Sequence, residues 1–131
     1  MKNIENLCRE LKIEQFFDFG KLGPMAKTNN NLDSLLFISI NSFDEMNNHL
    51  YKNNRTYIST LIVLGCWIEG FYKLTTITKA NQQSELISLI GEQMIILNDL
   101  IFIFEKYGNN KYMNNLTRDL KEIKKIYDGD F

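Results

Sequence analysis

Two long apolar stretches, residues 55–79 and residues 83–107, most constrain how this chain folds. Both lack proline, since the single proline of the 131-residue chain is Pro24, and proline is the residue that most strongly breaks a helix. On a helical wheel each stretch is apolar around most of its circumference, which is typical of a helix surrounded by protein. The narrow remainder of the first stretch holds the small residues Cys66 and Gly70, where another backbone is expected to approach closely. We therefore predict two largely buried central helices.

Amphipathic helices are predicted on both sides of this pair. Apolar residues recur every three or four positions in residues 3–12, 32–50 and 112–127, which is the spacing of one helix face. Residues 13–27 hold three phenylalanines together with Gly20, Gly23 and Pro24, which favours one or two short helical turns with a bend. Polar turns at residues 28–31, 51–54 and 108–110 separate the segments. The predicted fold is an all-α antiparallel bundle of five or six helices.

Length and charge exclude several classes of protein. The chain has the usual size of one domain, and we expect residues 1–131 to form a single domain without help from a metal or a disulfide. It carries 15 basic and 16 acidic residues, so it lacks the positive charge of a nucleic-acid-binding protein. Its longest apolar run, residues 61–68, is far shorter than the about 20 residues of a membrane span. We expect no nucleic-acid partner and no membrane-spanning segment.

Residues suited to catalysis or metal binding are scarce. His49 is the only histidine, which excludes the di-metal site of ferritin-like bundles, because that site needs two Glu-x-x-His elements. Glu45 lies four residues before His49, a spacing that ordinarily gives a surface contact. Cys8 and Cys66 match no metal motif and are expected to be unreactive packing residues. Since no phosphate-binding loop or dinucleotide fingerprint is present either, we expect no cofactor, no metal and no catalytic residue.

The most informative polar residue is Glu69, which lies within the first long apolar stretch. Its carboxylate is expected either to have an ordinary partner, which is Lys73 one helical turn later or a backbone or tyrosine donor of a neighbouring helix, or to face a pocket for a small ligand between helices. Gly65 and Gly70 would form the floor of that pocket. The candidate ligand-binding residues are Arg55, Trp67, Glu69 and Tyr72.

The middle half of the chain resembles a family of uncharacterised bacterial envelope proteins. The segments that carry the resemblance are residues 31–36 (Asn-Leu-Asp-Ser-Leu-Leu), 42–46 (Ser-Phe-Asp-Glu-Met), Leu50, 54–55 (Asn-Arg), 58–61 (Ile-Ser-Thr-Leu) and 65–72 (Gly-Cys-Trp-Ile-Glu-Gly-Phe-Tyr). The Gly-x-Trp-Ile-Glu-Gly block is the most specific of them. Members of this family are similar to small helical bundles carried behind a lipoprotein-type signal, so the resemblance implies that fold and an envelope location.

The same resemblance supplies neither an enzymatic activity nor a ligand, because none is assigned to the members of the family. Cys8 does not follow an apolar signal, so we do not expect it to be the lipid anchor of such a protein. The expected location is the periplasm or cell envelope if a leader has been trimmed, and otherwise the cytoplasm.

Together these features favour a noncatalytic binding or interaction domain whose partner is a protein or a small molecule. A small-molecule sensor or carrier, with a pocket near Trp67 and Glu69, is the first alternative. An unrecognised enzyme is the second, and it would require His49 in a cleft with a carboxylate or a thiol. The helices predicted for residues 32–50 and 55–79 carry more apolar surface than one bundle covers, which would also favour a symmetric homodimer.

Overall fold

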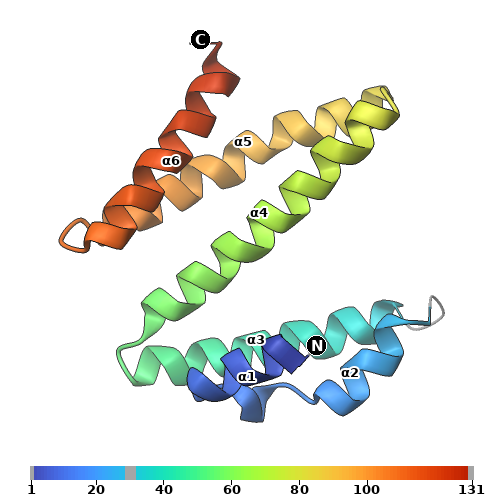
Figure 1. Cartoon of the computed structure of the whole chain (residues 1–131), viewed down its shortest axis with the longest axis vertical. Helices are drawn as coiled ribbons and strands as arrows, with labels where there is room; N and C mark the ends of the chain where they lie inside the picture. Colours follow the sequence, from blue (N-terminus) through green and yellow to red (C-terminus); the bar gives the residue numbers. More distant parts are fainter. Residues whose placement is uncertain (1, 29–31, 130–131) are drawn as a thin grey trace. The chain divides into compact units, whose positions relative to one another are not determined.

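The computed structural model describes residues 2–28 and 32–129, and all the regular structure in them is helical (Figure 1). In chain order the elements are α1 (Lys2–Glu10), the 3-10 helix η1 (Glu14–Phe16), α2 (Phe19–Ala26), α3 (Leu32–Lys52), α4 (Thr56–Ala80), α5 (Ser84–Glu105) and α6 (Lys111–Asp128). The prediction of an all-α bundle is confirmed, with six α-helices in the described part. Residues 29–31 of the predicted polar loop lie outside the described residues.

The helix boundaries agree with those predicted to within a few residues, because local features of the sequence set them. The predicted bend in residues 13–27 is η1 followed by α2. The side chain of Asp18 caps α2 by accepting a hydrogen bond from the amide of Lys21 at 3.1 Å. Pro24 lies in the second turn of α2, where its lack of a backbone N–H removes one hydrogen bond to the preceding turn, and the helix ends at Ala26. Asn110 caps α6 in the same way as Asp18 caps α2.

Helices α1 and α3 end with a non-glycine residue in the left-handed conformation. These residues are Lys12, with φ of 57°, and Asn54, with φ of 56°. The next amide, from Ile13 or Arg55, donates to the carbonyl five residues earlier, at 2.9 Å and 2.7 Å respectively. This bond belongs to the Schellman motif, which gives a partner to a carbonyl that the helix itself leaves unpaired.

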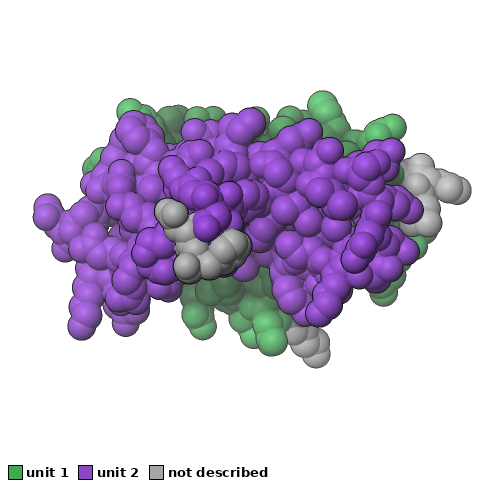
Figure 2. All heavy atoms as spheres, turned by 90° about the horizontal axis from the view of Figure 1, so that it is seen from above, with its two compact units in different colours: residues 1–59 green, residues 60–131 purple. Residues whose placement is uncertain are grey.

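The chain divides into two compact units, Met1–Ser59 and Thr60–Phe131 (Figure 2). Unit 1 holds α1, η1, α2, α3 and the first turn of α4. Its buried apolar residues are Cys8, Ile13, Met46, Leu50 and Ile58. The expectation that residues 1–131 form a single domain stays a prediction.

Unit 2 consists of α4 from residue 60 onward, α5 and α6. Within it, α4 and α5 run in opposite directions on either side of the turn at residues 81–83, and α5 packs most closely on α6 (Figure 1). All three helices contribute to one core, whose buried residues are Leu64, Trp67, Leu97, Leu100, Ile101, Phe104, Met113 and Leu120.

The prediction that the two central helices are largely buried is wrong. Only 17% of the most apolar 18-residue window of α4 is buried, and the same holds for α5. A helix that is apolar on every side needs neighbours on every side to be buried, whereas α4 contributes to the core of unit 2 through one side, with Leu64 and Trp67. On these two helices, the exposed apolar side chains of unit 2 are Leu61, Val63, Ile68, Tyr72 and Ile77 on α4, and Ile87, Leu89, Ile95, Ile96, Phe102 and Ile103 on α5.

Candidate functional site

Arg55, the first candidate ligand-binding residue, makes a structural contact in unit 1. It lies between α3 and α4, and its Nη2 donates a hydrogen bond to the carbonyl of Leu11 at 2.8 Å. The carbonyls at a helix end lack partners within the helix, and an arginine is well suited to bind them. Arg55 therefore joins the end of α3 to the end of α1. The other three candidate residues belong to unit 2.

Trp67 is a buried core residue with its polar group satisfied. Its ring stacks on Phe71, with the ring centroids 5.2 Å apart and the planes 6° from parallel. Its Nε1 donates to Oε1 of Gln93 at 3.1 Å and so connects α4 to α5. This contact explains why a tryptophan can be accommodated here, because a buried indole N–H without a partner would be costly.

Glu69 pairs with Lys73 on the outside of α4, as the first of the two interpretations predicted. Its Oε1 lies 3.0 Å from Nζ of Lys73, and both side chains are about two-thirds exposed. Tyr72 is exposed as well, at 66%. The expected close approach of another backbone at Cys66 and Gly70 is not seen in the described residues. Cys66 is exposed, and a Cβ built at Gly70 would meet nothing within 4 Å.

The four candidate residues are therefore divided between the two units. Arg55, Trp67 and Glu69 each contact a residue outside the candidate set. The joint role of all four in ligand binding stays a prediction. Gly65 and Gly70, the predicted floor of that pocket, both face open space, because a Cβ built at either residue would meet nothing within 4 Å.

The residues with reactive side chains are His49, Cys8 and Cys66. His49 packs its ring on Phe16, with the centroids 5.2 Å apart. Both cysteines are free thiols, with Cys8 buried and Cys66, which we expected to be a packing residue, exposed. Burial, together with the nearby negative charge of Glu14, raises the pKa of the Cys8 thiol, which keeps it in its less reactive form. Residues 2–28 and 32–129 contain no group of three or more His, Cys, Asp and Glu side chains that could hold a metal ion.

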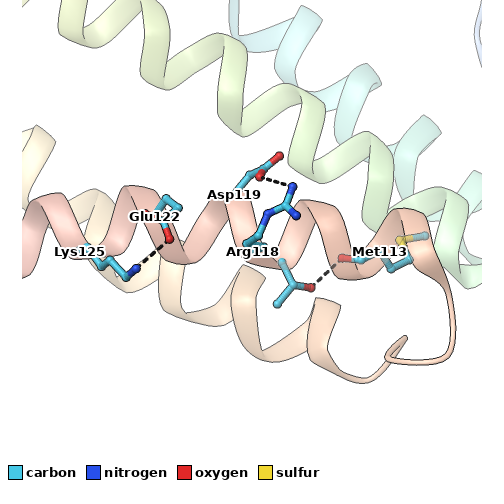
Figure 3. A network of polar contacts seen from close by, with 6 residues as sticks. Met113, Arg118, Asp119, Glu122 and Lys125 are labelled. Atoms are coloured by element: carbon cyan, nitrogen blue, oxygen red, sulfur yellow. Dashed lines mark hydrogen bonds and ion pairs between the residues drawn. The ribbon is translucent and has the colours of Figure 1, made fainter.

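Three basic residues of α6 pair with acidic neighbours, and two of these pairs are drawn in Figure 3. Nζ of Lys125 lies 2.8 Å from Oε1 of Glu122, and Arg118 contacts Asp119 at 3.4 Å. A third pair, Lys121 and Glu105 at 2.7 Å, joins α6 to α5. Two hollows of about 390 and 420 Å³ between these helices are lined largely by such charged side chains. Exposed pairs of this kind contribute at most about 1 kcal/mol each to stability, and the face is a solvated surface of mixed charge.

A third hollow in unit 2 is different, because its lining is almost entirely apolar. Its volume is about 520 Å³, and all three helices of the unit contribute to it. We call this hollow the apolar pocket. It is lined by Phe71 and Thr75 of α4, Ile90 of α5, and Ile123, Ile126 and Tyr127 of α6. Only part of this pocket was indicated by the sequence, in which Ile123 and Tyr127 lie on the apolar stripe of the last predicted helix.

Tyr127 connects the three helices that line the apolar pocket. Its hydroxyl donates to the carbonyl of Ile90 at 2.6 Å, which joins α6 to α5. Its ring lies beside Phe71 of α4, with the centroids 6.3 Å apart. Burial raises the pKa of the Tyr127 hydroxyl, because a phenolate is less well solvated there than in water. The protonated hydroxyl is the form that can donate the bond to Ile90.

By length and composition alone, α4 and α5 would each be able to cross a membrane. The mean hydropathy of their most apolar windows is 1.2 and 1.8. Two such helices do not by themselves identify a membrane protein, and the absence of a membrane-spanning segment stays a prediction.

Comparisons of the chain with known protein families, with curated proteins and with solved structures find no match.

Proposed function

We propose that this chain is a noncatalytic interaction domain and that α4 and α5 supply its interaction surface. The observation that carries the proposal is the low burial of these two helices, 17% of the most apolar window in each. Contiguous exposed apolar surface marks sites of association. Free energy gained by covering it scales with the apolar area removed from water.

One stripe of α5 has the geometry of a helix–helix interface. Leu89, Ile96 and Ile103 are all exposed and follow one another at intervals of seven residues. Seven residues are about two helical turns, so the three side chains lie along one line. Apolar residues at this interval supply one of the two apolar positions per heptad along which a second helix packs. The partner proposed here is therefore an apolar helix face of a protein, and a second copy of this chain is one such partner.

The charges within the two helices favour a protein partner over the interior of a membrane. Glu69 and Lys73 lie in the middle of α4, and Glu92 and Asp99 lie in α5. A charged side chain at the centre of a bilayer costs about 2.5–3.5 kcal/mol on insertion scales. At the rim of a protein interface the same side chains keep their contact with water.

A bacterial envelope location is part of the proposal and is supported by the resemblance of residues 65–72 to the envelope family. Fractionation of cells that express the full-length precursor tests it. Recovery with the envelope fraction is the expected result, and recovery in the soluble cytoplasmic fraction would contradict it.

The interaction surface is tested by a charge placed on the α5 stripe. We expect Ile96→Lys to weaken the complex by about tenfold or more, because a buried unpaired ammonium opposes association. Ile87→Lys is the matched control, since Ile87 is also an exposed isoleucine of α5 and lies about 180° around the helix from Ile96. Sedimentation velocity measures self-association, and pull-down from an envelope extract measures other partners.

The proposal would fail if the wild-type chain stayed monomeric at high concentration and also captured no specific protein. Equal behaviour of Ile96→Lys and Ile87→Lys would show that the stripe is not the interface. Far-UV circular dichroism of both variants checks that any difference arises from the surface and not from loss of the helices.

A further inference from the structure

We propose that the apolar pocket of unit 2 binds the hydrocarbon chain of a small lipid-like molecule. This inference goes beyond the interaction surface on α5 and rests on a separate set of residues. The pocket volume of about 520 Å³ lies within the range of about 300–1,000 Å³ that is usual for small-molecule sites.

The pocket is built on the most firmly packed part of unit 2. Phe71, Ile123 and Tyr127 pack against the buried core of the unit. The hydrogen bond from Tyr127 to the carbonyl of Ile90 fixes the distance between α6 and α5 at this point. A wall formed by three helices and fixed in this way is largely preformed, which lowers the entropic cost of binding.

The polar atoms of the pocket determine the chemistry of its ligand. Thr75 donates its hydroxyl hydrogen to the carbonyl of Tyr72 at 2.9 Å, and Tyr127 donates to Ile90 at 2.6 Å. Neither hydroxyl therefore has a hydrogen left to donate to a ligand. A peptide backbone in the pocket would bury carbonyl groups without a donor, which is costly, whereas a hydrocarbon chain has no such groups. Two other hollows of the unit are lined mainly by charged side chains and do not suit the same ligand.

The chain contains its own probe of this pocket. Trp67 is the only tryptophan, and its ring stacks on Phe71, which lines the pocket. A ligand that contacts Phe71 changes the surroundings of this pair. Fluorescence of Trp67 therefore reports on occupancy.

The test is a titration of the full chain with decanol and with decanoate, followed by Trp67 fluorescence and by the melting temperature. We expect saturable binding, similar affinities for the two compounds because the pocket holds the chain and not the head group, and a rise in melting temperature because the ligand binds the folded state. Ile126→Asp is expected to weaken binding by about tenfold or more, since a carboxylate would then face the apolar chain.

Ile95→Asp is the matched control. Ile126 is 61% exposed and Ile95 is 67% exposed, so neither substitution removes a core residue, but only Ile126 lines the pocket. Unchanged binding by Ile95→Asp and by Ile96→Lys would support the pocket as the site. Absence of saturable binding, binding of decanoate alone, or equal weakening in Ile126→Asp and Ile95→Asp would overturn the proposal.

Failure of the pocket proposal can be told apart from failure of the proposed interaction surface, because decanol binding and protein association are measured separately. Loss of protein association in Ile96→Lys with intact decanol binding would support both proposals. Intact decanol binding in a chain that associates with no protein would support the pocket alone.

Discussion

At the scale of single residues, Tyr127 makes the most consequential contact of unit 2. Its hydroxyl bonds to Ile90 across two helices whose contacting residues lie 37 positions apart in the sequence. We expect Tyr127→Phe to lower the free energy of unfolding by about 1 kcal/mol, the usual net value of such a bond. Urea unfolding measures the change. Tyr112→Phe is the control, since Tyr112 is 82% exposed, and its effect should stay within about 0.5 kcal/mol.

Because of Tyr127, we also expect the free energy of unfolding to change with pH in the alkaline range. Burial raises the pKa of Tyr127 in the folded state, whereas an unfolded tyrosine ionises near pH 10. Above about pH 10 the folded state therefore binds more protons than the unfolded state, and the free energy of unfolding falls as the pH rises. Tyr127→Phe lacks this contribution. The stability difference between the wild type and this variant should shrink as the pH rises past 10, and a constant difference would contradict the assignment.

Among the helices, α4 contains two glycines, Gly65 and Gly70, that no other part of the described structure packs against. A Cβ at Gly65 or at Gly70 would meet nothing within 4 Å, and glycine in a helix interior costs about 0.5–1 kcal/mol relative to alanine. We expect Gly65→Ala and Gly70→Ala each to raise the free energy of unfolding by about that amount, as measured in urea. A loss of stability would show that another backbone packs on α4 at that position.

Gly129 provides the opposite case on α6. It ends the helix with φ of 77°, a conformation in which a Cβ is strained. We expect Gly129→Ala to lower the free energy of unfolding by about 1 kcal/mol, although the same Cβ would also meet nothing within 4 Å. Equal effects at Gly65 and Gly129 would mean that backbone conformation does not decide the outcome.

At the scale of the whole molecule, the question is whether the two units unfold together. Helix α4 begins in unit 1 and continues through unit 2, so unfolding of either unit removes part of a helix that the other requires. We therefore expect one cooperative transition, consistent with a single domain. In a Cys66→Ser variant, Trp67 fluorescence follows unit 2 and the reactivity of the buried thiol of Cys8 follows unit 1. Two separate midpoints in urea would contradict the single domain.

The positions at which the helices begin and end could be predicted from the sequence to within a few residues. The responsible features are local: the apolar spacing, the absence of proline after Pro24, and caps such as Asn110, which accepts hydrogen bonds from the first amides of α6. The sequence also predicted the pairing of Glu69 with Lys73, because residues four apart on a helix face one another. None of these features depends on distant parts of the chain.

Tertiary structure alone decided which side of each helix is covered. A helix such as α4, which is apolar all round, has no preferred face on a wheel, so its sequence could not show that only one side is buried. The apolar pocket was missed for a related reason. Phe71, Ile90 and Tyr127 come from three helices, and their proximity depends on how those helices pack, which the periodicity of each helix taken separately does not specify.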